Sequence, residues 1–525
     1  CTHKRCRFYP NLCYLHGVRR RAGGAHIVVT NHALLFRDRA AAGGILPPLR
    51  YWIVDEAHAA ESEARKQLSV TADHRAIASL LGALHTEGRG GSIDAVRTRV
   101  RSRGVARGNE ELVGRAEALA ARLRGEVTTA TTIAESFFDF LKDLRTADDG
   151  YDSSELRLTP QVRDCTEWSI AAGVGHSLGR HLETIIAAGR DLLTALEEAG
   201  DDFVDARADL AGVLSRIRDQ LDGLESVLDG SDDSFVYSVR VGKRRDRRDS
   251  VEASMLDVGS ALLDRFYPDI HSVVYTSATM ATGDDFGHFA RTIGLDRLPA
   301  SSWRSLRLDS SYDFDRQMSV FIPTDLPEPR GTAHYDALER LLLGVHQAMG
   351  GSVLTLFTSK KEMDELYDRL VGPLAALGQN LLLQGRGVSN KRVRDEFLAD
   401  ERLSLFATKS FWEGFDAKGD TLRCVVIARL PFGRVRDPLY EERQQRLGRR
   451  AWDDFYLPEA VLELKQAAGR LVRSSSDEGC VIVADGRLSA GKGYARAFIE
   501  ALPVSDVELL STAKLVEQVR ERFGR

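Results

Sequence analysis

The 525-residue sequence is poor in cysteine, has no long apolar run and carries no strong excess of either charge. Six cysteines are too few for a disulfide framework in a chain of this length. No run of about eighteen or more apolar residues occurs, so we expect no membrane span and a cytoplasmic location. The formal net charge of -5 is ordinary for a globular protein, so any nucleic-acid partner must bind to local patches of the surface.

What the sequence does contain is a repeated alternation of short apolar runs with helical stretches. With 43% hydrophobic residues it can build several cores, and its length alone favours about three or four domains. Strands that alternate with helices are typical of parallel sheets covered on both faces, and the alternation occurs twice, so we expect two α/β domains. The apolar runs that predict strands lie at 26–36, where a helix start follows, and at 51–58, 272–280, 351–359, 403–410, 422–432 and 480–485.

A different pattern interrupts this alternation. Between residues 60 and 232 apolar residues recur at three- and four-residue spacing, as in LAGVLSRIRDQLDGLESVL, which predicts a long, mostly helical insertion. Residues 234–256 then alternate at both ends around a charged centre, a pattern typical of a β-hairpin with a basic tip. We favour a solvated loop for this tip over a DNA contact.

The stretch VDEAH (54–58) places two adjacent carboxylates at the end of a predicted strand. Because α/β folds bind ligands at the carboxyl ends of their strands, this position suits nucleotide hydrolysis. Asp55 would bind Mg²⁺, usually through its water shell, and Glu56 would orient and deprotonate the attacking water. Taken alone, an Asp-Glu pair in this position is more often a favourable charge at a helix N-terminus.

The stretch QAAGRLVR (466–473) carries two arginines that are three residues apart. If this stretch is helical, Arg470 and Arg473 lie on one face, and Gly469 allows close approach of another group. Two guanidinium groups at this spacing can bind a γ-phosphate in the manner of arginine fingers. The alternative is a surface helix with two solvated arginines.

Two further stretches carry polar residues near strand ends. TSATM (276–280) offers hydroxyl groups, and SFWEGFDAKGD is a glycine-rich, aromatic stretch that carries Glu413 and Asp416. Phe411 and Trp412 are candidates for stacking on bases, although aromatic residues beside such a loop are equally often part of a core. Each of these signals is weak by itself.

In this order and spacing, the stretches resemble those of the iron–sulfur DNA helicases of superfamily two, specifically the DinG-type branch related to XPD. The resemblance extends from residue 1 to about residue 505 and is weakest across the helical insertion, where the family has its arch domain. SFWEGFD followed by the QAAGRLVR box is its most specific part. The stretches that carry it are HIVVTNHALL, VDEAH, TSATM, LFTSKKEM, SFWEGFDAKGDTLRCVVIARLPF and QAAGRLVR.

The resemblance implies an ATP-dependent DNA helicase with ATP and Mg²⁺ bound between two RecA-like domains. It implies 5′ to 3′ translocation on single-stranded DNA, duplex unwinding in DNA repair or replication, forked DNA as a partner, and a monomer. The catalytic residues that it implies are Asp55, Glu56, Arg470 and Arg473, and the nucleotide-binding residues are these four with His58, Gly414, Asp416 and Gln466. The implied domains are a partial iron–sulfur element (1–25), part of the first helicase domain with its acidic box (26–69), an arch-like helical insertion (70–233), the remainder of the first helicase domain (234–300) and the second helicase domain (301–525).

Half of the cysteines lie within the first thirteen residues. The family holds a 4Fe-4S cluster with four cysteine thiolates, and Cys1, Cys6 and Cys13 match the last three of them. The resemblance therefore implies that the fourth ligand and the ATP-binding P-loop lie upstream, so we expect the sequence to begin inside a domain. A zinc site that uses His3 or His16 as its fourth ligand is the alternative.

The stretch GRLSAGKG (486–493) comes close to a P-loop, but Gly493 stands where the Mg²⁺-binding hydroxyl group is required. The sequence contains no complete P-loop, so we expect the chain by itself to be inactive as an ATPase. Two other interpretations stay open at this point. One is a non-catalytic DNA-binding fragment, and the other is a nucleic-acid-dependent ATPase that acts on RNA or on a protein partner.

Overall fold

The computed structural model divides into two compact units, each with sheets of its own. Unit 1 comprises Cys1–Thr276, Thr292–Leu295 and Val435–Arg446, and unit 2 comprises Ser277–Arg291, Asp296–Arg434 and Leu447–Arg525. The structure describes residues 9, 11–41, 43–106, 110–144, 153–199, 203–242, 249–283, 285–408, 411, 419–434 and 436–524. No helix within these ranges is long and apolar enough to cross a membrane.

Unit 2 is an α/β domain around one seven-stranded parallel sheet with the strand order β13-β7-β12-β11-β8-β10-β9. The predicted strands at 351–359, 403–410, 422–432 and 480–485 are confirmed as β8, β10, β11 and β12. The strands β7, β9 and β13 escaped prediction because their apolar runs are short or interrupted. The bounds of the seven strands are β7 (Met318–Pro323), β8 (Val353–Phe357), β9 (Asn380–Leu383), β10 (Leu403–Thr408), β11 (Cys424–Ile427), β12 (Gly479–Val483) and β13 (Glu508–Leu510).

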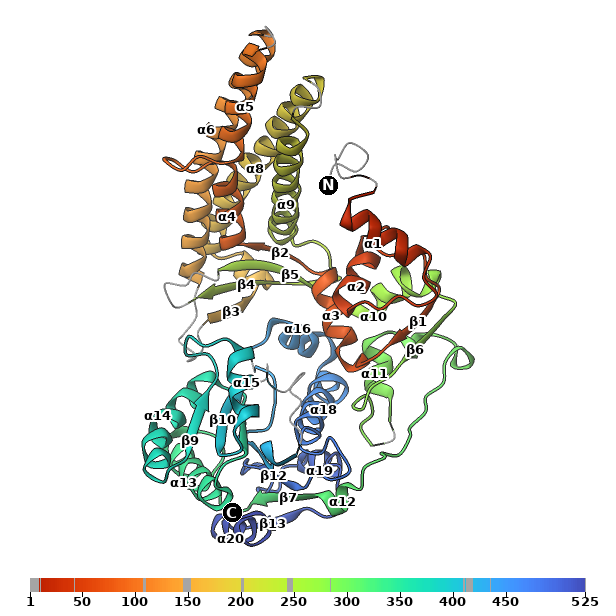
Figure 1. The fold of residues 1–525 in the computed structure, drawn as a ribbon, viewed down its shortest axis with the longest axis vertical. Helices are drawn as coiled ribbons and strands as arrows, with labels where there is room; N and C mark the ends of the chain where they lie inside the picture. The colour runs from red at the N-terminus through yellow and green to blue at the C-terminus, as the bar shows by residue number, and fades with distance from the viewer. Residues whose placement is uncertain are drawn as a thin grey trace. The chain divides into compact units, whose positions relative to one another are not determined.

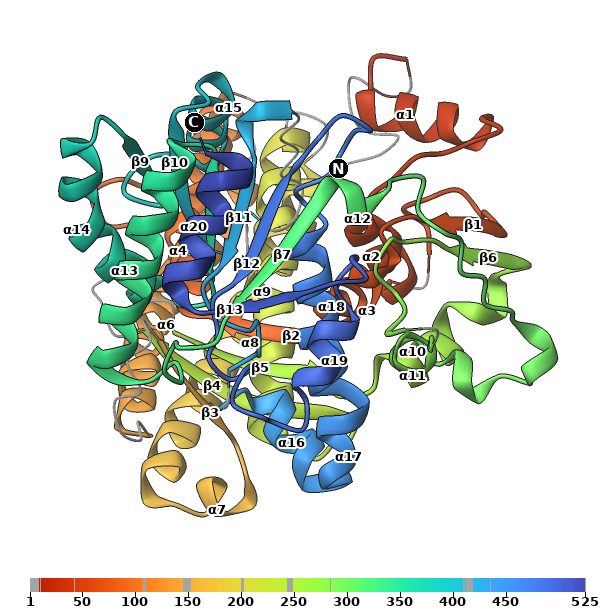
Figure 2. The ribbon, with the colours of Figure 1, turned by 90° about the horizontal axis from the view of Figure 1, so that it is seen from below.

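Helices cover both faces of this sheet, as expected for parallel strands (Figure 2). Because side chains alternate along a strand, Val320 and Ile322 of β7 enter one core while Phe321 enters the other. One face packs against α13 (Gly331–Met349), α14 (Lys360–Ala376) and α20 (Thr512–Phe523), and the other against α15 (Asn390–Ala399), α18 (Leu457–Ala468) and α19 (Ala495–Glu500). Shorter helical segments are α11 (Gly287–Thr292), α12 (Phe314–Gln317), α17 (Arg449–Ala451) and the π-helical turn η10 (Trp452–Tyr456).

Unit 1 contains a much smaller parallel sheet, formed by β1 (Tyr51–Val54) and β6 (Ser272–Tyr275). Both strands were predicted and are confirmed. Trp52 and Val54 are buried, whereas Tyr51 and Ile53 on the opposite face are 70% and 76% exposed. The helices of this part are α1 (Tyr14–Gly23), α2 (His32–Ala40), α3 (Ala60–Leu68) and α10 (Val258–Arg265), and α16 (Pro438–Leu447) contributes all but its last residue to unit 1.

The strand expected at the start of residues 26–36 is wrong. Residues 27–31 form no strand in this described part of the chain, and Ile27 and Val29 are 83% and 93% exposed. A short apolar run becomes a strand only through ladder hydrogen bonds to a neighbour, and its sequence does not reveal whether that neighbour exists. The predicted helix start is confirmed: Asn31 caps α2, and its side chain accepts a hydrogen bond from the Leu34 amide at 2.8 Å.

The predicted helical insertion is present as long helices that stand on a four-stranded antiparallel sheet with the order β2-β5-β4-β3 (Figure 1). The predicted hairpin is confirmed as β4 and β5, while its basic tip at 243–248 lies outside the described residues. Because β5 pairs with β2, the insertion's sheet continues beyond residue 233, where we expected the insertion to end. Its elements are β2 (Val70–Asp73), α4 (His74–Leu84), α5 (Ser92–Ala106), α6 (Glu110–Phe140), β3 (Ser153–Arg157), α7 (Pro160–Arg163), α8 (Thr166–Glu198), α9 (Val204–Asp229), β4 (Phe235–Gly242) and β5 (Ser250–Met255).

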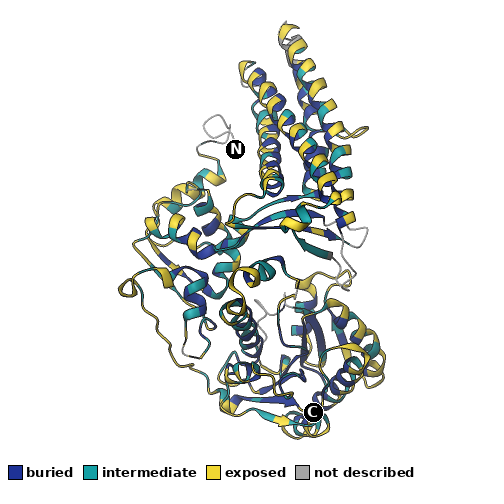
Figure 3. Ribbon diagram, turned by 180° about the vertical axis from the view of Figure 1, so that it is seen from behind, coloured by how far each residue is buried: buried dark blue, intermediate teal, exposed yellow. Residues whose placement is uncertain are grey.

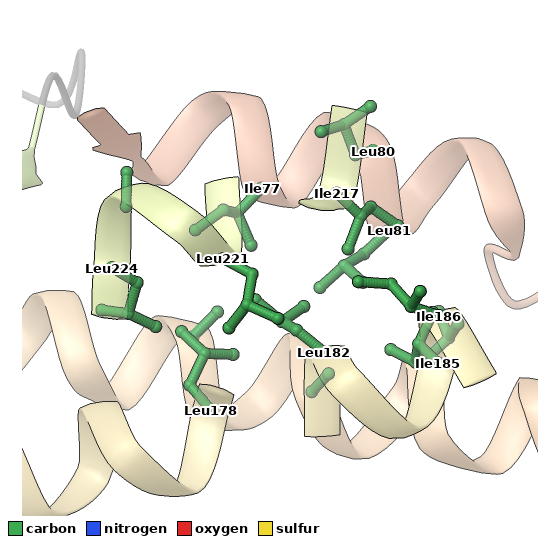
Figure 4. Close-up of a cluster of buried hydrophobic side chains, with 14 of the residues drawn as sticks. Ile77, Leu80, Leu81, Leu178, Leu182, Ile185, Ile186, Ile217, Leu221 and Leu224 are labelled. Carbon is green, nitrogen blue, oxygen red and sulfur yellow. The ribbon is translucent and has the colours of Figure 1, made fainter. Parts of the chain in front are cut away.

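Apolar stripes on these helices form one continuous core (Figure 4). Leu178 and Leu182 of α8 meet Leu221 and Leu224 of α9, as the 3.6-residue period of the sequence predicts. The outer faces of the same helices are exposed, so buried and exposed residues form stripes along them (Figure 3). At Gly223 the α9 backbone approaches β2 so closely that an added Cβ would lie 2.6 Å from the carbonyl carbon of Thr71.

Candidate functional site

The carboxyl ends of β1 and β6 carry the acidic turn, which we define as Asp55 and Glu56. Both side chains are exposed, and Glu56 adopts a left-handed backbone conformation with a φ of 50°. Backbone hydrogen bonds fix this turn to the TSATM stretch: the Thr276 amide donates to Val54 O at 2.9 Å, and the Ala57 amide donates to Thr276 O at 3.0 Å. The left-handed conformation is strained for a residue with a side chain, and such strain is concentrated at functional sites.

Two histidines border the acidic turn. The His32 Nε2 atom lies 2.8 Å from the backbone oxygen of Asp55, so the first residue of α2 holds this turn from a second side. His58 Nδ1 lies 3.3 Å from Glu56 Oε2, which brings the predicted nucleotide-binding histidine to the predicted catalytic glutamate. His32 was not predicted, although it lies in the HIVVTNHALL stretch.

The arginine box is not helical throughout. Helix α18 ends at Ala468, and Arg470 and Arg473 lie in the loop that follows, here called the arginine loop (residues 469–477). The condition for two arginines on one helical face is therefore not met, because α18 ends before either arginine. Gln466 remains on α18, and its Nε2 atom donates to Thr279 Oγ1 of the TSATM stretch at 3.0 Å.

A buried carboxylate that the sequence analysis did not identify holds the arginine loop. Asp477 is only 4% exposed and accepts hydrogen bonds from the amides of Arg473 at 2.7 Å, Ser474 at 2.8 Å and Gly419 at 3.2 Å, and from the Ser474 hydroxyl at 2.6 Å. Burial by itself would raise the pKa of Asp477, but these hydrogen bonds outweigh it and hold the pKa below its usual range. Only the fold reveals this role, since an Asp after a run of serines has no distinctive sequence signal.

The aromatic, glycine-rich stretch is described only at its edges. Trp412, Glu413, Gly414 and Asp416 lie outside the described residues. Phe411 is 4% exposed and packs in the core of unit 2, so the core interpretation is correct for this residue. The bond from Gly419 to Asp477 ties the end of this stretch to the arginine loop.

The near P-loop at 486–493 has a structural role. Asp485 is fully buried and accepts hydrogen bonds from the Leu430 amide at 2.8 Å and from Arg487 Nη2 at 2.6 Å. Burial opposes ionisation of Asp485, but Arg487 and the amides hold its pKa below its usual range. The Arg487 guanidinium lies 5.2 Å from the centroid of the Phe432 ring, and Lys492 pairs with Glu328 at 2.6 Å. The contacts of Asp485 and Arg487 clamp the ARLPF stretch.

Of the three cysteines that match the family's cluster ligands, only Cys13 lies among the described residues. It caps α1, and its Sγ atom accepts a hydrogen bond from the His16 amide at 3.4 Å. Within the described ranges, no three His, Cys, Asp or Glu side chains converge on a point that could hold a metal ion. Cys1, Cys6 and the rival ligand His3 fall outside these ranges, so the ligand set stays a prediction.

The fold is α/β, with two RecA-like domains and a helical insertion. A solved chain named "XPD_APO" has a TM-score of 0.50 to this chain at 14% identity, and the match covers 87% of this chain and 76% of that one. This likeness concerns the fold alone. Residues 342–505 match the family described as "Helicase C-terminal domain".

Sequence comparison gives the more particular relationship. The chain is 27% identical over 527 residues to the curated protein "3'-5' exonuclease DinG" of Bacillus subtilis (strain 168). The aligned region covers 98% of this chain and 55% of that protein. It is 34% identical over 235 residues to "ATP-dependent DNA helicase YoaA" of Escherichia coli (strain K12), which covers 44% of this chain and 35% of that protein. The chain is thus similar in sequence to proteins named DinG and YoaA, and it spans about half the length of the Bacillus relative.

Proposed function

We propose that this chain forms most of an ATP-driven motor that moves along single-stranded DNA and separates duplexes. The observation that carries the proposal is that one stretch, TSATM, bonds to residues that adjoin two predicted catalytic elements. Thr276 bonds to Val54 and Ala57, which flank the acidic turn, within unit 1, and Thr279 bonds to Gln466, which precedes the arginine loop, within unit 2. Such a stretch suits a motor in which hydrolysis at one element is communicated to the other.

Within this proposal each element has one chemical task. Asp55 would hold Mg²⁺, whose charge neutralises the phosphates when it is bound, and the exposed carboxylate at a strand end fits that role. Glu56 would orient the attacking water and accept its proton, with His58 beside it. Arg470 and Arg473 would stabilise charge that develops on the transferred phosphoryl group, and Gln466, Gly414 and Asp416 would complete the nucleotide site.

The finer features follow from the family resemblance and belong to the same proposal. They are 5′ to 3′ movement, single-stranded and forked DNA as substrates, a role in repair or replication, a monomer, and a cytoplasmic location. Cys1, Cys6 and Cys13 would be thiolate ligands of a 4Fe-4S cluster together with a fourth cysteine. A version of the chain extended upstream through a P-loop and a fourth cysteine, referred to below as full-length protein, should then contain about four irons when it is purified anaerobically. Stoichiometric zinc without visible absorption would favour the Cys₃His alternative instead.

Strand displacement on matched DNA and RNA forks tests the proposed function. Full-length protein should separate DNA forks only with ATP, whereas preferential activity on RNA forks would favour the RNA-dependent ATPase. The 525-residue polypeptide itself lacks a complete P-loop sequence. We therefore expect it to bind DNA but to hydrolyse ATP only slowly. DNA binding without strand displacement in the full-length protein would favour the non-catalytic DNA-binding alternative.

A further inference from the structure

Helix α16 belongs to a different unit from the chain on either side of it. The residues up to Arg434 and those from Leu447 onward belong to unit 2, but residues 435–446 belong to unit 1. Along the chain, α16 lies between β11 and α18, and α18 leads directly into the arginine loop. The helix start is encoded locally, because Asp437 caps it by accepting from the Tyr440 amide at 2.9 Å and Pro438 occupies the first helical position.

One set of α16 contacts reaches the helix that follows the acidic turn. Arg443, which is only 8% exposed, donates from Nη2 to Glu61 Oε1 of α3 at 3.2 Å. Glu61 is also paired with Arg65 of the same helix, and Arg65 Nη1 donates to the backbone oxygen of Leu256 at 3.3 Å. Because α3 begins four residues after Glu56, this network connects α16 to the segment that carries the acidic turn.

A second set of contacts reaches the sheet of the insertion. Arg157 at the end of β3 donates from Nη1 to Glu442 Oε2 at 2.5 Å and from Nη2 to Gln445 Oε1 at 2.6 Å. Its side chain is 13% exposed and that of Glu442 is 19% exposed, so solvent screens this pair less than an ordinary surface ion pair. Arg446 binds the other oxygen of Glu442 at 2.7 Å and so orients that carboxylate.

We propose that α16 is a coupling helix through which the segment bearing the arginine loop holds both α3 and the insertion sheet. Arg443 and Arg157 are its two positioning residues, and neither touches a group that we assign to the chemistry. Movement of the chain on either side of α16 is passed to α3 by Arg443 and to β3 by Arg157. The inference rests on the proposed function, because what it couples is ATP turnover to strand separation.

Hydrogen exchange of the nucleotide-free full-length protein tests the anchors without any need for activity. Arg157→Gln should raise exchange across 438–446 by roughly tenfold, and Arg443→Gln should raise it in both 60–68 and 438–446. The matched control is Arg240→Gln on the same sheet, whose 44% exposed side chain pairs with Glu155 at 2.9 Å and Glu252 at 4.0 Å, both on that sheet. If Arg443→Gln does not fold, Arg443→Lys retains the charge and should show the same pattern more weakly.

Coupling is measured as base pairs separated per ATP hydrolysed. Arg157→Gln should lower this ratio by about fivefold while DNA-stimulated ATP turnover stays within about twofold of the wild type. The reversed pair Arg157→Glu with Glu442→Arg should restore most of the ratio, which a merely structural defect would not do. The inference would be overturned if Arg157→Gln showed the same hydrogen exchange, and the same number of base pairs separated per ATP, as Arg240→Gln. If the wild-type protein hydrolyses no ATP, the proposed function fails, while the exchange results still decide whether α16 is anchored as described.

Discussion

The acidic turn and the arginine loop are held in place in opposite ways. The acidic turn is open to solvent, with Glu56 in a strained left-handed conformation and its position set by backbone bonds to Thr276 and by His32. The arginine loop is fixed from beneath by Asp477, a buried carboxylate with four hydrogen-bond donors. One element exposes its carboxylates on a constrained backbone, while the other depends on a buried charge.

This difference fits the tasks proposed for the two elements. A carboxylate that binds hydrated Mg²⁺ or activates a water must be accessible, so its geometry has to come from the backbone. A long arginine side chain can reach a phosphate only if the loop beneath it does not move, and a buried, fully hydrogen-bonded carboxylate provides that rigidity. Substitutions in the two elements should therefore differ in their effects on activity and on stability.

The largest expected effect concerns activity alone. Arg470→Ala or Arg473→Ala in full-length protein should slow DNA-stimulated ATP turnover by about a thousandfold if they act as arginine fingers. DNA binding without nucleotide should hardly change. The control is Arg450→Ala, since Arg450 is 72% exposed, lies in the same unit and pairs with Asp454 at 3.2 Å. Normal turnover in both variants would show that the loop is not part of the catalytic site.

A second effect is a loss of stability in acid that is specific to unit 2. Burial lowers the pKa of His346 in α13 to about 4, and its Nδ1 atom lies 3.0 Å from Ser404 Oγ. The folded state keeps this imidazole neutral, so the unfolded state binds a proton more readily. The free energy of unfolding is therefore unaffected above about pH 6.5 and falls as the pH drops towards 4. The total loss over this range is about 3 kcal/mol.

Urea unfolding at pH 7 and pH 5 measures this effect. The free energy of unfolding of unit 2 should fall more steeply with acid in the wild type than in His346→Leu, which cannot be protonated there. Equal pH dependence in the two proteins would contradict the assignment.

Asp477→Asn tests the support of the arginine loop. Loss of the charge that four donors bind should lower the free energy of unfolding of unit 2 by about 2 kcal/mol at neutral pH. The pKa of Asp477 is lowered in the folded state, so its contribution is present above about pH 3.9 and disappears only as the pH falls further. ATP turnover should also fall, whereas a variant as stable as the wild type at about pH 7 would mean that Asp477 does not support the loop.

The smallest expected effect tests whether unit 1 also depends on close backbone contacts away from the acidic turn. Gly223→Ala places a methyl group against the Thr71 backbone and should lower the free energy of unfolding of unit 1 by about 1 to 2 kcal/mol. Gly212→Ala in the same helix meets no atom within 4 Å and should instead stabilise by about 0.5 to 1 kcal/mol. Calorimetry on the pair would contradict this account if both substitutions had the same sign.

The sequence predicted elements well where a local pattern was sufficient. Strands that end in polar residues, the long helices of the insertion and the hairpin at 234–256 all follow from the period of their apolar residues. The failures have a common cause in partners that lie far away in the chain. The run at 27–31 is apolar but unpaired within the described residues, and the support of Asp477 and Arg157 arises from contacts that only the fold creates.

Under the proposed function, the acidic turn and the arginine loop serve one hydrolytic step. DNA-stimulated phosphate release by full-length protein should be measured for Glu56→Gln, Arg473→Ala and the double variant. If both act on the same transition state, each single change should cost about a thousandfold, and the double variant should be hardly slower than either. Losses that multiply in the double variant, or a normal rate in either single variant, would contradict the account.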